Sequence, residues 1–266
     1  MNVVGYCRLS KDDNKSRYSS IEAQQELALD YAKRKGWEIQ KFYIDDDITG
    51  FLQNEKRPEF YKMLQAIDEG NVDVVIGRDN VLMGQAVGNA IVAALGGKGN
   101  AKGKILEVMG SGGDRVQEAR SKGFHNAVDS ERGIEVIQSP HCDYVRSKAA
   151  TATQDIIQRH RDIVLIYGHN DDMSLGALQV CEDAGLKVMC SGVDGLMEAV
   201  EAITKGRYLA TSANDPFAFG QMAVEVAVKL MRGESVGKEV DAGTFLIDSS
   251  NARQYFDPSI AFAKKK

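Results

Sequence analysis

Short apolar runs alternate with amphipathic stretches along the first third of the chain. The predicted strands are residues 2–7, 38–44 and 72–76. Between them, one helix is predicted to begin after Ser20 and end at Gly36, and another spans 59–69 before Gly70. Glycine directly after an apolar periodic stretch is a common helix stop. This alternation predicts an α/β fold with parallel strands.

The same alternation continues to the C-terminal region. The predicted strands are 104–109, 134–138, 163–167, 187–191, 208–213 and 243–247, and the predicted helices are 85–95, 115–130, 146–159, 172–184, 196–205 and 217–232. A turn is expected around Asp79-Asn80, as a crossover between two lobes. No linker rich in Pro, Ser or Gly interrupts residues 72–85, which indicates continuous packing there.

Three motifs follow one another in the N-terminal part of the chain. They are Tyr6-Cys7-Arg8-Leu9-Ser10, Ser20-Ile21-Glu22-Ala23-Gln24 and Arg57-Pro58-Glu59-Phe60. Over about residues 1–80 this pattern resembles the catalytic domain of serine recombinases of the resolvase/invertase type. The resemblance implies that Ser10 attacks a DNA phosphate, which Arg8 and Arg57 hold, with Gln24 and Thr49 nearby.

The segment after the third strand departs from the recombinase pattern. Leu82 and Gln85 stand where that family has two arginines. Each lost phosphate donor removes roughly 2–4 kcal/mol of transition-state stabilisation. The family's long assembly helix and DNA-binding domain are not recognisable. The net charge of −5 argues weakly against a dedicated DNA-binding protein, which usually carries a basic face. We therefore expect Arg8, Ser10, Gln24 and Arg57 to be vestigial, with no enzymatic activity and no nucleic-acid partner.

A second set of motifs begins at Asp79. Its segments are Asp79–Gly84, Gly96–Asn100, Arg120–Phe124, His169–Ala177, Val193–Gly195 and Ala213–Pro216. In this order and spacing, to about residue 257, they resemble the type I periplasmic binding proteins of the ribose/galactose class. The resemblance implies a non-enzymatic solute-binding protein with a monosaccharide or similar small polyol as its partner.

The candidate ligand residues stand where predicted strands end or helices begin, which is where open α/β sheets bind ligands. The resemblance implies that Arg120, Asn170, Asp194 and Asn214 bind sugar hydroxyls and that Tyr144 stacks on the sugar face. Other roles stay open for each: Asn170 and Asp194 as helix caps, Arg120 as a partner of surface carboxylates, and Tyr144 as a packing residue.

The two resemblances together predict a two-lobed chimera. The first lobe, flavodoxin- or resolvase-like, is expected to comprise residues 1–80 and about 215–245. The second, like type I periplasmic binding proteins, is expected to comprise 81–214 and about 246–266. Loops of the first lobe do not match sugar-contacting patterns, so we expect half of a monosaccharide site. The missing export signal favours an engineered chimera over a natural fusion.

Other features narrow the function further. No secretory signal or run of 18 apolar residues is present, which predicts no membrane association and a cytoplasmic or recombinant cytoplasmic location. The four cysteines lack CxxC spacing and are expected to be free thiols, and the scattered histidines predict no metal. The turn 96–103 lacks the phosphate-loop pattern, and no cofactor is expected. Two alternatives remain: a structural chimera without a ligand, and a serine recombinase.

Overall fold

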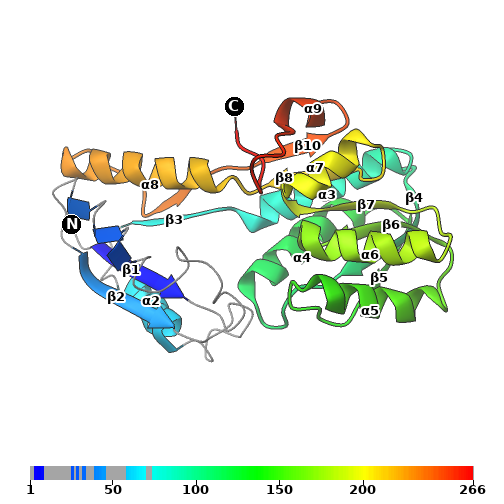
Figure 1. Cartoon of the computed structure of the whole chain (residues 1–266), viewed down its shortest axis with the longest axis horizontal. Coiled ribbons are helices and arrows are strands. Elements are labelled where there is room, and N and C mark those ends of the chain that lie inside the picture. The colour runs from blue at the N-terminus through cyan, green and yellow to red at the C-terminus, as the bar shows by residue number, and fades with distance from the viewer. Residues whose placement is uncertain are drawn as a thin grey trace. The chain divides into compact units, whose positions relative to one another are not determined.

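The computed structural model of the chain describes residues 3–8, 25–26, 28–29, 32–33, 39–45, 58–69 and 74–265 (Figure 1). The chain divides into two compact units. Unit 1 comprises residues 1–77 and 223–240, and unit 2 comprises 78–222 and 241–266. One boundary therefore falls between Gly77 and Arg78, and another falls inside helix α8 (Pro216–Met231).

Unit 1 contains a pair of parallel strands, β1 (Val3–Arg8) and β2 (Ile39–Asp45), in which Tyr6 lies opposite Tyr43. Helix α2 (Pro58–Asp68) follows, and β3 (Val75–Gly77) pairs with β9 (Glu239–Asp241). Of the recombinase-like positions, Ser10, Gln24, Thr49 and Arg57 lie outside the described residues, and Arg8 is described only as backbone in β1.

Unit 2 is built on a six-stranded sheet in the order β10-β8-β7-β6-β4-β5. The strands are β4 (Lys102–Val108), β5 (Gly133–Gln138), β6 (Ile163–Gly168), β7 (Met189–Asp194), β8 (Ala210–Ala213) and β10 (Phe245–Asp248). All neighbouring pairs are parallel except the antiparallel β8–β10 pair. The predicted α/β fold with parallel strands and flanking helices is confirmed.

Helices cover both faces of this sheet (Figure 1). They are α3 (Asn80–Ala94), α4 (Arg115–Val128), α5 (Arg146–Ile157), α6 (Asp171–Asp183), α7 (Met197–Thr204) and α9 (Ala252–Tyr255). Successive strand residues point to opposite faces, so Ile105 of β4 packs with α3 and α4, whereas Leu106 packs with α5, α6 and α7. Both faces of the sheet are thus buried, as parallel strands require.

The turn expected around Asp79-Asn80 is instead the start of α3. The Asp79 carboxylate accepts hydrogen bonds from the backbone N–H of Val81 and Leu82 at 2.9 and 3.0 Å, so it caps the helix. Met83 is then fully buried on the first turn of α3. The helix thus begins at Asn80 rather than at the predicted Gln85. Strand β9 and helix α9 were not predicted, since such short elements carry no periodic pattern.

Helices α3 and α4 approach each other at the level of their backbones. A Cβ atom added at Gly123 would lie 2.0 Å from the carbonyl oxygen of Val81, and one added at Gly84 would lie 2.1 Å from that of Arg120. Both positions therefore require glycine. This close approach places the start of α3 directly against the turn of α4 that carries Arg120.

Among the residues that the structure describes, no helix is long and apolar enough to cross a membrane. Cys142, Cys181 and Cys190 are buried free thiols.

Gly123→Ala is expected to lower the free energy of unfolding by about 1–3 kcal/mol, because the added methyl group forces the two helix backbones apart. Gly220→Ala in α8 is the matched control, since its added Cβ would meet nothing within 4 Å. That change is expected to stabilise the helix by up to about 1 kcal/mol. Urea unfolding of both variants measures the difference; equal stabilities would contradict the close-packing argument.

Candidate functional site

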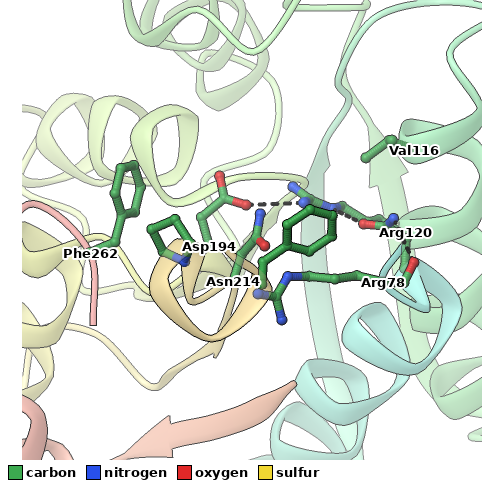
Figure 2. A pocket seen from close by; sticks show the side chains of 9 residues that line it. Arg78, Val116, Arg120, Asp194, Asn214 and Phe262 are labelled. Carbon is green, nitrogen blue, oxygen red and sulfur yellow. Dashed lines mark hydrogen bonds and ion pairs between the residues drawn. The ribbon is translucent and has the colours of Figure 1, made fainter. Parts of the chain in front are cut away.

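A pocket of about 480 Å³ opens at the carboxyl ends of the central strands of unit 2 (Figure 2). Its lining residues come from segments far apart in the sequence but all within unit 2: Arg78, Asn80, Val116, Arg120, Asp194, Asn214, Pro216, Phe219 and Phe262. Strand ends and helix starts are the usual place for ligands in open α/β sheets. The lining combines charged and amide groups with two aromatic rings, which suits a small polar ligand.

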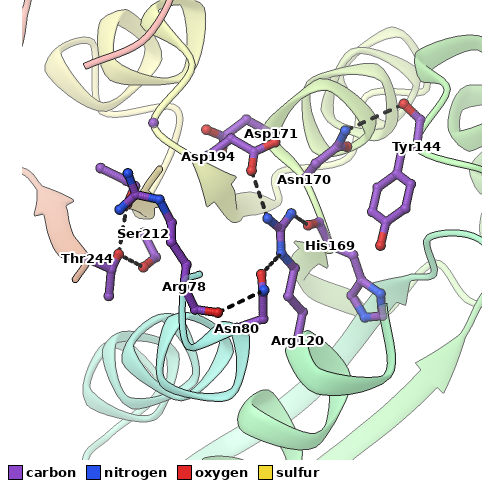
Figure 3. A network of polar contacts seen from close by, with 12 residues as sticks. Arg78, Asn80, Arg120, Tyr144, His169, Asn170, Asp171, Asp194, Ser212 and Thr244 are labelled. Carbon is purple, nitrogen blue, oxygen red and sulfur yellow. Dashed lines mark hydrogen bonds and ion pairs between the residues drawn. The ribbon is translucent and has the colours of Figure 1, made fainter. Parts of the chain in front are cut away.

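Arg120 forms the polar centre of this pocket, and only 5% of its surface is exposed. Its Nε donates to Asn80 Oδ1 at 3.0 Å, its Nη1 donates to the backbone carbonyl of His169, and its Nη2 donates to Asp194 Oδ1 at 3.0 Å (Figure 3). Burial lowers the pKa of Arg120, but the charge and hydrogen bond of Asp194, together with Tyr144 and Tyr167, outweigh it, so the net pKa is raised. The guanidinium is therefore cationic and fixed in orientation.

Asp194 ends β7 in a left-handed backbone conformation, with φ of 123°, and Gly195 follows at 72°. A buried carboxylate supports this turn: Asp171 accepts hydrogen bonds from Leu196 N and Thr211 Oγ1, both at 2.8 Å. Thr211 Oγ1 in turn accepts from Gly195 N at 3.0 Å. A non-glycine residue at positive φ is strained and persists only where its surroundings enforce it, which is typical of ligand-binding turns.

The two acids of this turn are electrostatically linked. Burial raises the pKa of Asp194, while the charge of Arg120 and hydrogen bonds from Arg120 and Asn214 oppose the rise. Burial, followed by the nearby charge of Asp194, raises the pKa of Asp171 to about 7. Arg120, Asp194 and Asn214 thus present donors and acceptors side by side, which can meet adjacent hydroxyls of a polyol.

Two of the five residues expected to bind ligand do not line the pocket. The Asn170 side chain caps α6, with Oδ1 accepting from Met173 N at 2.9 Å. Tyr144 lies in a turn at φ 59°, and its hydroxyl donates to Asp114 Oδ2 at 2.8 Å. The Tyr144 ring covers Gly110, where an added Cβ would lie 2.6 Å from it. The structure brings together Arg120, Asp194 and Asn214.

Other lining residues were not predicted as ligand groups. Arg78, Phe219 and Phe262 lie outside the quoted motifs, and no sequence signal singles them out. Asn80 belongs to the Asp79–Gly84 motif, but its direct contact with Arg120 became visible only in the structure.

A buried carboxylate lies behind the pocket. Glu107, which is fully buried, accepts hydrogen bonds from Ser121 Oγ at 2.8 Å, Gln138 Nε2 at 2.8 Å, His169 Nε2 at 2.9 Å and His125 Nε2 at 3.1 Å. Burial raises the pKa of Glu107, but the interactions with His125, His169 and Gln138 together lower it more, so its net pKa lies well below the ordinary value. Glu107 is therefore ionised.

His169 connects this carboxylate to the pocket. Its Nδ1 accepts from Gly110 N at 3.2 Å, so its Nε2 carries the proton that is donated to Glu107. The carbonyl of the same residue accepts from Arg120. Glu107 and His169 thus help to position Arg120 without lining the pocket. In the described part of the chain, no group of three or more His, Cys, Asp or Glu side chains is arranged to hold a metal ion.

The contribution of His125 to the stability of the folded protein is expected to fall as the pH becomes alkaline. Its hydrogen bond to Glu107, opposed by burial and helped by Asp129, raises its pKa from 6.5 to about 9. A raised histidine pKa contributes stability that is fully present below pH 6.5 and is lost as pH rises through about 9. His125→Gln keeps a donor toward Glu107 but does not titrate.

The melting temperatures of wild type and His125→Gln should therefore converge between pH 6.5 and about 9, with wild type more stable at the acidic end. Differential scanning calorimetry across this range measures the difference. A constant gap between the two proteins would contradict the role of the His125–Glu107 pair.

Comparison with known families shows the family to which the chain belongs. Residues 60–235 match the family model described as Periplasmic binding protein domain. This match covers more than half of the chain, and the chain belongs to that family. Residues 3–80 match a second model, described as Resolvase, N terminal domain. Both resemblances inferred from the motifs are confirmed, and the two matches overlap at residues 60–80.

Several sugar-binding proteins are similar to the chain. The ribose import binding protein of Bacillus subtilis is 32% identical over 178 residues, which are 67% of this chain and 56% of that protein. The ribose import binding protein of Salmonella typhimurium is 35% identical over 196 residues, 72% of this chain and 64% of that protein. The chain thus spans 56–64% of the length of these curated relatives.

Solved structures share the fold along almost the whole chain. An ABC transporter solute-binding protein from Mycobacterium smegmatis with bound glycerol has a TM-score of 0.71 and 33% identity, covering 99% of both chains. A periplasmic solute-binding protein from Actinobacillus succinogenes with bound D-allose has a TM-score of 0.70 at 20% identity, covering 96% of this chain and 100% of that one. The second likeness shows the fold alone.

Proposed function

We propose that the chain is a non-enzymatic solute-binding protein that takes a monosaccharide or similar small polyol in the pocket around Arg120. The observation that carries the proposal is the ion pair of buried Arg120 with partly buried Asp194, beside Asn214 at the carboxyl ends of parallel strands. These groups offer both donors and acceptors, as sugar hydroxyls require. The ribose-binding relatives and the glycerol-bound structure support this ligand class.

We propose further that the chain is an engineered chimera that retains half of a monosaccharide site. The resolvase match at residues 3–80 supports this origin, as do Leu82 and Gln85 in place of the recombinase arginines. The described lining of the pocket comes from unit 2 alone. A ligand enclosed on one side loses affinity, because binding must overcome its translational and rotational entropy. Weak binding is therefore the expectation.

Calorimetric titration tests the binding proposal. Ribose, galactose, glucose, arabinose, xylose, inositol and glycerol are titrated into wild type, and at least one should give saturable heat. Asp194→Ala should abolish that heat, because it removes an acceptor and leaves Arg120 unpaired. Asp155→Ala, an exposed acid on α5, should bind as wild type does.

Removal of a buried ion-pair partner typically costs about 3–5 kcal/mol of stability, so folding of Asp194→Ala is checked by thermal melting. Asp194→Asn keeps the side-chain shape and is the variant of choice if the alanine variant unfolds. Absence of heat with every sugar for folded wild type would overturn the proposal and leave the structural chimera without a ligand.

The match of residues 3–80 to the resolvase N-terminal domain favours one rival function, serine recombination of DNA. In that case Ser10 attacks a DNA phosphate and forms a covalent protein–DNA adduct. We expect no adduct when the chain is incubated with supercoiled DNA, since Leu82 and Gln85 supply no phosphate donor with a charge. An adduct seen by denaturing gel, and lost in Ser10→Ala, would establish the rival.

A further inference from the structure

Arg78 is the first residue of unit 2 and lines the pocket, although it lies within the resolvase match. Its Nη1 donates to the carbonyl of Gly243 and its Nη2 donates to the carbonyl of Asp215. Its Nε is buried and, within the described part of the chain, has no hydrogen-bond partner. Each Nη also carries a further N–H, so the guanidinium is held in place with donors to spare.

The charge of Arg78 is not balanced by an ion pair. Asp194 is already paired with Arg120 at 3.0 Å, and among the described residues Arg78 forms no ion pair of its own. Burial lowers the pKa of Arg78, and the charges of the Asp215 and Asp241 carboxylates oppose this effect. Neither carboxylate is among the residues that line the pocket.

Backbone N–H groups already donate hydrogen bonds to both of those carboxylates. Asp215 accepts from Phe217, Ala218 and Lys265. Asp241 accepts from Asp79 and Gly243. Among the described residues that line the pocket, there are two guanidinium groups and a single carboxylate, so this lining carries one positive charge in excess.

We propose that the pocket selects a sugar-sized polyol that carries one anionic group, and that Arg78 is the residue that determines this specificity. The inference rests on the proposed function and names its substrate class. A guanidinium held at two nitrogens by carbonyls, with its Cζ 5.6 Å from the Phe219 ring centroid, is already oriented for a carboxylate or phosphate. Asn80, Asp194 and Asn214 remain available for the hydroxyls of the same ligand.

Matched neutral and acidic ligands test the proposal. Galactose is compared with galacturonate, glucose with glucuronate, and ribose with ribonate and ribose 5-phosphate, each titrated calorimetrically into the full chain. Hydrogen bonds to charged groups predict that an anionic ligand binds about ten- to hundred-fold more tightly than its neutral counterpart. The uronates and ribonate report on a carboxylate, and ribose 5-phosphate reports on a phosphate.

Two variants that each remove one positive charge separate a local effect from a general one. Arg78→Gln should abolish the preference for the anionic ligand, so that each acidic ligand and its neutral counterpart bind the variant with equal affinity. Arg132→Gln changes an exposed residue just before β5, at the opposite end of the strands, and should keep the preference. Thermal melting confirms that both variants are folded.

The possible results distinguish the anionic preference, the role of Arg78 and the proposed function. Equal or tighter binding of the neutral sugars to wild type would overturn the inference and leave the proposed function standing. An anionic preference that survives Arg78→Gln would also overturn the role of Arg78. Absence of binding by every neutral and acidic ligand would overturn the proposed function together with the inference.

Discussion

The ion pair between buried Arg120 and partly buried Asp194 is the interaction on which the rest of the site depends. A charge taken out of water is tolerated only when it is paired and its remaining hydrogen bonds are satisfied. Arg120 meets this condition through Asp194 at the end of β7, the His169 carbonyl after β6, and Asn80 at the start of α3. Arg120 therefore ties together three elements, and the glycine contact between α3 and α4 brings it close to Asn80.

Two buried carboxylates, Glu107 and Asp171, help to position this pair. Their surroundings shift their pKa values in opposite directions. Glu107 receives donors from two histidines and from neutral groups, so its charge is stabilised and its pKa is lowered. Asp171 receives only neutral donors and lies near the charge of Asp194, so burial dominates and its pKa is raised. Both acids fix backbone positions that the pocket uses, one through His169 and the other through the turn after Asp194.

The junction of the two family matches is part of the candidate site. Residues 60–80 match both family models, and they contain most of α2 and all of β3. Directly after this strand, Arg78 lines the pocket and Asp79 caps α3. The residues that depart from the recombinase pattern, Leu82 and Gln85, belong to that same helix. The resolvase match therefore ends at the residues where the lining of the candidate sugar-binding pocket begins.

The sequence by itself determined the α/β class and the succession of strands and helices along the chain, because apolar periodicity is a local property. The family resemblance also predicted Arg120, Asp194 and Asn214 as ligand residues, and these three line one pocket at the carboxyl ends of parallel strands. Only the tertiary structure decided where side chains point. The backbone at Tyr144 directs its hydroxyl to Asp114, and Asn170 caps its own helix. Arg78, Phe219 and Phe262 meet across long stretches of chain, and no local pattern encodes such contacts.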